Sequence, residues 1–423
     1  MMPLAPIVNL SVRSVYNRRL AVALTIFAIG VSVMLVLGVE KVRQDAKRSF
    51  ANTISGTDLI VGARSGSIQL LLYSVFRIGS ATNNISWKSY RAVTRRKDVK
   101  WTIPISLGDS HMGFRVMGTS KDYFRYYQYG QKRNLNFDAG LPFNDIFDTV
   151  LGAEVAANLG YELGQKIIID HGLGSGGFAK HEDKPFRVVG ILSRTGTPVD
   201  RTVHVSLEGI TAIHVDWKSG ARVPGMAVDA EAVRQMDLTP RSITAVMVGL
   251  SSRLDAFRAL REINNFRGEP LLAILPGVAL QELWGLMGTA EAALGAISIL
   301  VVVGGLLGML TMLLANLNQR RREMAILRAI GARPQDVGAM FLVEAILITL
   351  AGCIFGLGLL YMGMSILQPL IEARLGLFIP ISAPSYDDWL ILGAIVSAAS
   401  VTGLFPAFLA YRQSLSDGMT LRM

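Results

Sequence analysis

The sequence predicts an α+β membrane protein with four transmembrane helices and a large α+β extracytoplasmic domain inserted between the first helix and the second. Three observations support this fold class. The chain has four long apolar runs, and its basic residues gather in the short segments on one side of them. About 250 residues of ordinary globular composition separate the first run from the second, enough for one or two domains.

Each apolar run is long enough to cross a bilayer as a helix. The first, Leu20 to Val39, has twenty residues without an ionisable side chain, which make roughly 30 Å of helix. The others are Ala292 to Leu317, the run that begins after Glu344 and continues to Ile371, and Leu390 to Tyr411. The first run is longer than a signal-peptide core and Leu37 to Lys41 offers no cleavage site, so we expect an uncleaved anchor.

The basic residues predict the orientation. Arginines are concentrated before the first run, between the second and third, and after the fourth, whereas the remaining short loop is acidic overall. Because positive residues stay on the cytoplasmic side, we expect both termini to be cytoplasmic. Much of the net charge of +10 is thus a topology signal. No basic stripe interleaved with aromatic residues indicates nucleic-acid binding.

Hydrophobic patterning predicts short strands and helices in the segment between the first two runs. The expected strands are Gln165 to Asp170, Phe186 to Leu192, Thr202 to Ser206 and Ile243 to Gly249. The expected helices are Gly152 to Leu159 and Arg253 to Phe266, the latter from the spacing of Leu254, Phe257, Leu260 and Ile263.

The expected domain organisation follows from these elements. The divisions are an amphipathic segment with the first transmembrane helix (1–40), the extracytoplasmic domain (41–285) with an inserted subdomain (about 106–224), the second helix (286–317), a cytoplasmic loop (318–338), the third helix (339–371), a short outer loop (372–388), and the fourth helix with the tail (389–423).

Motifs of the common enzyme classes are missing from the sequence. It contains no G-x-x-x-x-G-K-[ST], so the chain does not hydrolyse ATP by P-loop chemistry, and no G-x-S-x-G or H-E-x-x-H. The glycine-rich loop at 172–177 precedes a strand rather than a helix, which favours a hairpin tip over a phosphate cradle. We therefore expect no catalytic residues and no cofactor bound directly.

All five histidines lie in the large domain: His111, His171, His181, His204 and His214. Their spacings do not match a metal-ligand pattern, although His171 and His181 share a loop with Glu182 and Asp183. We therefore predict no metal site and keep zinc binding as the minor alternative. The single cysteine, Cys353, lies inside the third apolar run and is expected to be a packing residue.

An apolar stretch, Ser67 to Ile78, stands out in the extracytoplasmic domain. One interpretation is a core helix or strand. The other is a substrate or partner surface formed by Leu70, Leu71, Leu72 and Phe76. The core interpretation is favoured.

The segment RRREMAILRAIGA, Arg320 to Ala332, combines charge with an apolar face between two membrane runs. It predicts a short amphipathic helix, with Met324, Ala325, Leu327 and Ile330 toward the membrane boundary or the groove of a partner. Gly331 suits a helix end, and Pro334 with Asp336 suits the start of the next helix. Further along, Glu344 lies inside a membrane run and is predicted to pair with Arg328 or Arg333.

Four blocks of sequence resemble the permease subunits of the MacB/FtsX-like, mechanotransmission type of ABC transporter. They are Asn9 to Leu37, Val150 to Ile169 with the two strands that follow it (FRVVGIL and DRTVHVSL), Arg320 to Leu360, and Gly403 to Arg422. The resemblance covers nearly the whole chain, and the third block is the most specific.

The resemblance implies a division of labour. A separate ABC ATPase subunit would dimerise on binding ATP beneath two permease chains, as a homodimer or a heterodimer, and the second helices would carry that closure to the extracytoplasmic domains. ATP would thus act through the partner, which would dock on a coupling helix that includes Glu323, Met324, Leu327, Arg328, Ile330, Gly331 and Ala332. The chain would lie in the bacterial inner membrane.

Two functions follow from this resemblance. The first is export or extraction of a lipoprotein, a peptide or a small hydrophobic compound, assisted by a periplasmic adaptor or substrate protein. The alternative is FtsX-like regulation of an extracytoplasmic enzyme or adaptor. The size of the domain favours the first. The substrate and the direction of transport are left open.

Overall fold

The computed structural model describes residues 18–171, 179–218, 221–222, 228–319, 331–375 and 381–412, together with Met324, Ile326 and Ala329. Two compact units make up the chain. The helical unit comprises Met1–Asp45, Gly288–Leu370 and Ile379–Met423, and the α/β unit comprises Ala46–Met287 and Ile371–Phe378.

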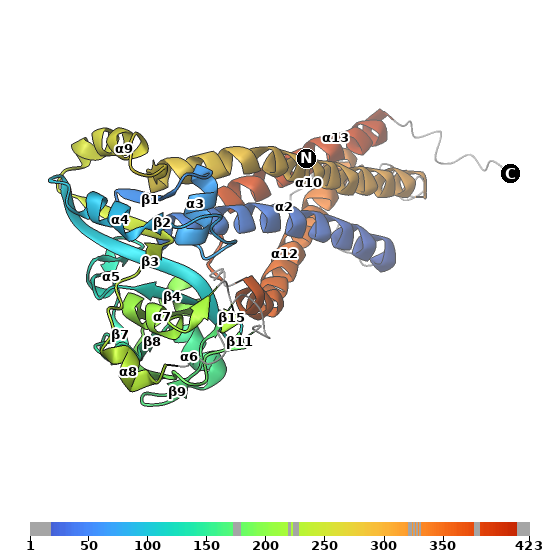
Figure 1. Cartoon of the computed structure of the whole chain (residues 1–423). Helices are drawn as coiled ribbons and strands as arrows, with labels where there is room; N and C mark the ends of the chain where they lie inside the picture. Colours follow the sequence, from blue (N-terminus) through green and yellow to red (C-terminus); the bar gives the residue numbers. More distant parts are fainter. Residues whose placement is uncertain are drawn as a thin grey trace. The chain divides into compact units, whose positions relative to one another are not determined.

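Four long helices dominate the chain (Figure 1). They are α2 (Arg19–Thr53), α10 (Pro276–Gln319), α12 (Pro334–Leu375) and α13 (Tyr386–Arg412). Among the described residues, these four are long and apolar enough to cross a membrane. Large apolar side chains on their outer faces are exposed, among them Leu24, Phe27, Leu300, Ile354 and Phe405. A helix surrounded by lipid tolerates such exposure, because all its backbone hydrogen bonds are made internally.

Small residues bring α2 and α12 close together. A Cβ atom added at Gly356 would lie 2.6 Å from the carbonyl oxygen of Gly30, and one added at Gly352 would lie 2.6 Å from Cγ2 of Ile29. Gly352 and Gly356 are four residues apart and so share one face of α12. In a membrane, where dispersion contacts replace the hydrophobic effect between helices, this small-xxx-small pattern favours close packing.

The α/β unit is built on one mixed sheet, which has twelve strands among the described residues. The main path runs β18-β1-β17-β3-β4-β13-β8-β12-β7, and the pairs β4–β13 and β8–β12 are parallel. The strands of this path are β1 (Leu59–Ala63), β3 (Val99–His111), β4 (Phe114–Thr119), β7 (Phe137–Gly140), β8 (Asp148–Leu151), β12 (Phe186–Leu192), β13 (Thr202–Ser206), β17 (Ala245–Leu250) and β18 (Leu271–Ile274).

Short strands complete the unit. β9 (Lys166–Ile167), β10 (Asp170–His171) and β11 (Ala179–Lys180) join the main sheet. Three two-stranded pairs are β2 (Ile85–Ser86) with β16 (Ser242–Ile243), β5 (Gln128–Tyr129) with β6 (Arg133–Asn134), and β14 (Trp217–Lys218) with β15 (Ala221–Arg222).

Short helices accompany the sheet. They are α3 (Ser67–Ser74), α4 (Trp87–Thr94), α5 (Asp122–Tyr126), α6 (Ala153–Leu159), α7 (Leu207–Ile213), α8 (Ala230–Arg234) and α9 (Ala256–Asn264), with 3₁₀ turns at Pro198–Arg201 and Arg253–Asp255. Serines cap two of the helices: Ser86 Oγ accepts from the backbone N–H of Ser89 at the start of α4, and Ser206 Oγ accepts from that of Gly209 in α7.

The long strand β3 joins the two halves of the sheet and is drawn as the curved cyan ribbon in Figure 1. One part of it pairs with β17, and the remainder pairs with β4 and, at its end, with β10. The subdomain boundary expected near residue 106 falls inside this strand. The chain here forms one continuous sheet with hydrophobic clusters on both halves.

Most of the strands and helices expected from patterning are present. β12 and β13 have the predicted limits, and α6 begins one residue later than expected. The run Gln165 to Asp170 forms two short strands, β9 and β10, instead of one.

The expected apolar stripe of α9 is wrong in part. Leu254 and Phe257 are 92% and 71% exposed, whereas Ala256, Ala259 and Ile263 are buried. The helix therefore presents Ala256, Ala259 and Ile263 to the core, with Leu260 packed partly buried against it, and leaves Phe257 at the surface.

Candidate functional site

The predicted coupling segment is described only in part. Glu323, Leu327, Arg328 and Ile330 lie outside the described residues, as does Ala325. Met324 is only 5% exposed and belongs to the core of the helical unit, and Ala332 is 8% exposed. Both side chains are therefore buried within this chain, and their part in coupling stays a prediction. Ile326, by contrast, is 59% exposed and presents an apolar side chain at the surface.

The predicted start of the next helix is confirmed. Gly331 has a φ of +107°, a conformation that side-chain-bearing residues rarely adopt, and α12 begins at Pro334. The carboxylate of Asp336 accepts a hydrogen bond from the backbone N–H of Arg333 at 3.0 Å. Asp336 thereby satisfies a donor that the first turn leaves without an intrahelical partner.

Glu344 is fully buried on α12, next to Ala345 in the core of the helical unit. Arg333 precedes it by eleven residues, about 16 Å along a helix axis, which exceeds the combined reach of the two side chains. The predicted pair with Arg333 is therefore wrong. The alternative partner, Arg328, lies outside the described residues, and a pair with it stays a prediction.

The apolar stretch around α3 belongs to the core. Leu70 and Leu71 are fully buried and Phe76 is 6% exposed, within a cluster that includes Tyr73, and Leu72 packs half-buried against that cluster. The core interpretation is therefore correct, and the substrate-surface interpretation of Leu70, Leu71, Leu72 and Phe76 is not.

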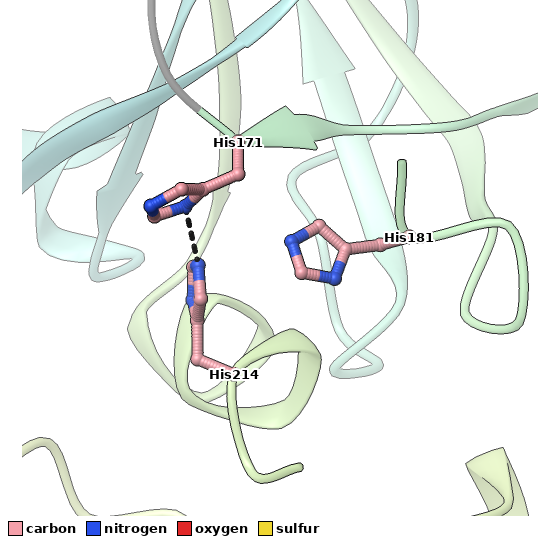
Figure 2. A group of neighbouring side chains, drawn as sticks. All are labelled: His171, His181 and His214. Carbon is pink, nitrogen blue, oxygen red and sulfur yellow. Dashed lines mark hydrogen bonds between the residues drawn. The ribbon is translucent and has the colours of Figure 1, made fainter. Parts of the chain in front are cut away.

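The structure brings together three histidines that are far apart in the sequence. His171 ends β10, His181 follows β11, and His214 caps the C-terminal end of α7. Figure 2 shows the three imidazole rings turned toward one another. One ring nitrogen from each lies within 4.8 Å of the corresponding atoms of the other two. Sequence spacing did not predict this cluster.

Asp109 extends the histidine cluster. Its Oδ1 lies 3.1 Å from Nδ1 of His171 and 3.4 Å from Nε2 of His214. His171 and Asp109 are direct partners in the antiparallel pairing of β10 with β3, which places their side chains on the same face of the sheet. Asp109 is 4% exposed, so its carboxylate meets the histidines away from bulk water.

The ionisation of the cluster reflects burial and this carboxylate. Burial favours a raised pKa for Asp109, but the hydrogen bonds of His171 and His214 outweigh it and lower the pKa to about 2. Burial favours a lowered pKa for His214, yet the bond to Asp109 raises it. His181 lacks such a carboxylate contact, and burial together with the nearby His214 lowers its pKa to about 4.

A buried ion pair lies beside the cluster and ties two of its segments together. Nζ of Lys184 is 3.1 Å from Oδ1 of Asp216, and neither side chain is exposed. The backbone N–H of Lys184 donates to the carbonyl oxygen of His181 at 3.2 Å. Trp217 packs its ring on that of His181, with centroids 4.5 Å apart. The turn carrying His181 is thereby joined to the segment that follows His214.

One signal in the sequence pointed to part of this cluster. His171 and His181 flank the glycine-rich loop that was predicted to be a hairpin tip, and residues that flank such a tip lie close together. No comparable signal pointed to His214, because it lies at the end of α7, 33 residues after His181 in the chain.

Comparisons with known proteins agree with this architecture of long apolar helices and a mixed α/β unit. The family model of the MacB-like periplasmic core domain matches residues 22–262, more than half of the chain. The family model of the FtsX-like permease C-terminal region matches residues 295–415. These two matches define the class of protein. It is a multi-pass permease component of an ABC transporter, located in the bacterial inner membrane. The chain belongs to the MacB/FtsX-like family, whose permeases work with ABC ATPase partners.

Relatives match parts of the chain. The pyoverdine export ATP-binding/permease protein PvdT of Pseudomonas savastanoi pv. phaseolicola is 25% identical over 57% of this chain, and the match covers 35% of PvdT. The macrolide export ATP-binding/permease protein MacB of Photorhabdus laumondii is 37% identical over 17% of this chain and 11% of that protein. The chain thus spans about a third of the length of PvdT.

Two solved structures resemble the chain in part. The periplasmic region of MacB from Actinobacillus actinomycetemcomitans covers 55% of this chain and 94% of its own, with 12% identity and a TM-score of 0.33. The extracellular domain of YknZ, a noncanonic ABC-type transporter from Gram-positive bacteria, covers 52% and 99%, with 13% identity and a TM-score of 0.31.

Proposed function

We propose that this chain is a permease subunit that transmits the ATP-driven motion of a separate ATPase to an α/β unit outside the cytoplasm, inserted between the first and second membrane spans. One observation carries the proposal. The boundary between the two units falls inside α2, after Asp45, and inside α10, after Met287. Each of these helices thus belongs to the helical unit and to the α/β unit, as a mechanical link requires.

The lengths of the two helices support this role. About 20 residues, roughly 30 Å, are enough to cross the hydrocarbon core of a bilayer. α2 has 35 residues, about 52 Å, and α10 has 44 residues, about 66 Å. Both therefore continue well beyond the membrane as helix, and a helix transmits displacement along its axis better than an irregular linker does.

Contacts between α2 and α10 occur in both units. In the helical unit, Oγ of Ser32 donates a hydrogen bond to the carbonyl oxygen of Val301 at 3.1 Å. In the α/β unit, the ring of Phe50 packs edge-on against Trp284, with centroids 5.5 Å apart. The pairing supports movement of the two helices as one element.

The cargo belongs to the same proposal. The relatives named as pyoverdine and macrolide export proteins support export or extraction of a small hydrophobic compound, a peptide or a lipoprotein. The working form contains two permease chains and an ABC ATPase on the cytoplasmic side, where both termini also lie. ATP is used by the partner, and the coupling residues Glu323, Leu327, Arg328 and Ile330 lie at that contact.

Ile326 offers the sharpest test of ATPase docking, because its apolar side chain is exposed in the coupling segment. We expect Ile326→Asp to reduce co-purification of the ABC ATPase at least tenfold, since a carboxylate on an apolar docking surface must be desolvated on binding. The measurement is the ATPase-to-permease ratio after tandem purification from detergent-solubilised membranes.

Ile78→Asp is the matched control. Ile78 is 53% exposed in the α/β unit, so the chemical change is the same at a site away from the coupling segment. Its ATPase ratio should equal that of the unmodified chain. Equal recovery of ATPase with Ile326→Asp would overturn the docking role of this segment.

A further inference from the structure

We propose that His171, His181 and His214 form a binding site for a divalent transition-metal ion, zinc above all, with Asp109 as the fourth ligand. This inference rests on the α/β unit alone and is independent of the transport function proposed above. Three imidazoles and one carboxylate make a donor set that suits zinc in tetrahedral coordination.

The distances fit a common ion. Zinc binds imidazole nitrogen at 2.0–2.1 Å, so two ligand atoms on one tetrahedral zinc are about 3.4 Å apart. Nδ1 of His171 is 3.1 Å from Nε2 of His214, and Oδ1 of Asp109 is 3.1 Å and 3.4 Å from the same two atoms. One ring nitrogen of His181 lies within 4.8 Å of those of His171 and His214.

His181 supplies an independent observation. Its side chain is fully buried, and neither ring nitrogen has a hydrogen-bond partner among the residues that the structure describes. Burying an imidazole without hydrogen-bond partners is unfavourable, so such groups are rare unless a ligand completes them. Figure 2 shows this ring directed at the other two histidines. An ion in the cluster would satisfy one of its nitrogens.

The surroundings hold the ligands as metal sites do. Nδ1–H of His214 donates to the carbonyl oxygen of Ile210 at 2.8 Å, which leaves the lone pair of Nε2 directed at the cluster. The backbone N–H of His181 donates to the carbonyl oxygen of Ile169 at 3.2 Å. The Lys184–Asp216 ion pair joins the remaining segments. These bonds preorganise the ligands, which reduces the ordering that binding must supply.

The experiment measures zinc bound to the full-length protein, purified in detergent without a polyhistidine tag and stripped with EDTA. We expect equilibrium dialysis to give about one zinc per chain. His171→Asn, His181→Ala and His214→Ala should each weaken binding at least tenfold, and Asp109→Asn should do so by about 10–100-fold. Zinc should raise the thermal midpoint of the unmodified chain and leave that of His214→Ala unchanged.

His111→Gln is the matched control. His111 lies in the same unit, but its two ring nitrogens already contact the carbonyl oxygen of Ile168 and the hydroxyl of Tyr161. We expect this variant to bind zinc as the unmodified chain does. Equal loss of zinc in His111→Gln would overturn the site. So would equal zinc on the unmodified chain and on a variant that combines His171→Asn, His181→Ala and His214→Ala.

A cobalt spectrum tests the geometry without any variant. Co²⁺ in a four-coordinate site absorbs visible light strongly, whereas six-coordinate Co²⁺ absorbs weakly. We expect one equivalent of Co²⁺ to give the strong spectrum with the unmodified protein and zinc to abolish it. A weak, six-coordinate spectrum at saturation contradicts the proposed ligand set.

Discussion

At the scale of single residues, the α/β unit buries histidines in very different surroundings. His204 is fully buried, stacks on Tyr123 with ring centroids 5.2 Å apart, and directs Nδ1 at the carbonyl oxygen of Val150. Burial, with a smaller contribution from the nearby charge of Arg77, lowers its pKa from 6.5 to about 3. His204 is therefore neutral in the folded protein near pH 7.

This depressed pKa predicts sensitivity to acid. In the unfolded chain His204 is protonated as the pH falls below about 6.5, whereas in the folded chain it is protonated only near pH 3. The contribution of His204 to stability is thus complete above pH 6.5 and is lost as the pH falls. We expect it to account for roughly 2 kcal/mol of the stability lost between pH 7 and pH 5.

The measurement compares His204→Gln with the unmodified chain by urea denaturation at the two pH values. The variant should lose about 2 kcal/mol less on acidification, whatever its stability at pH 7. Other titrating groups act equally in both proteins and cancel. An identical fall in stability in both would show that His204 does not titrate in this way.

At the scale of elements, close packing of α2 against α12 depends on glycine. Gly356 approaches the backbone of Gly30, and a Cβ atom there would also lie 2.8 Å from that of Val33. Gly358, two residues further along α12, has nothing within 4 Å of the corresponding point. The same substitution at both positions therefore separates two effects on stability. One is the packing of α2 against α12, and the other is the helix propensity of the new residue.

Gly356→Val should destabilise the helical unit by about 1–3 kcal/mol, because the backbone of α2 has to move away. Gly358→Val should be neutral or slightly stabilising, since valine is a better helix former than glycine. The thermal midpoint and the monodisperse yield in detergent measure the difference. Equal midpoints for the two variants would mean that the helices are not held together at this point.

The elements also show which features of the fold hydrophobic patterning can predict. The period-2 runs of β12 and β13 and the glycine-to-proline signal at the start of α12 are local, and they were predicted with their limits or within a residue of them. The apolar stripe expected on α9 is buried only in part, because which side of a helix meets the core depends on the sheet beneath it. Ala256 and Ala259 face that sheet, and the larger Phe257 does not.

At the scale of the whole molecule, the central question is the side of the membrane on which the α/β unit lies. The chain has a single cysteine, Cys353, which is buried on α12. A Cys353→Ala background therefore allows one reporter cysteine at a time. Ile78, in the α/β unit, and Ile326, in the coupling segment, are both exposed and suit this use.

We expect a membrane-impermeant maleimide to label Ile78→Cys in spheroplasts, because the proposed orientation places the α/β unit outside the cytoplasm. Ile326→Cys should be labelled only after the membrane is permeabilised, since the arginines of that segment predict a cytoplasmic loop. Gel shift after labelling measures the two outcomes. Labelling of Ile326→Cys in intact spheroplasts would reverse the proposed orientation.

The sequence alone was sufficient for whatever depends on local composition. Some features are properties of residues that are neighbours in the chain, so they could be predicted without the tertiary structure. They are the four apolar runs of membrane length, the break at Gly331 and Pro334, and the family blocks. The histidine cluster could not be predicted in this way. It exists because β10 pairs with β3 and α7 ends beside them, and these long-range pairings bring His171, His214 and Asp109 to one point. Contacts between residues distant in the chain are set by packing, and no local pattern records them.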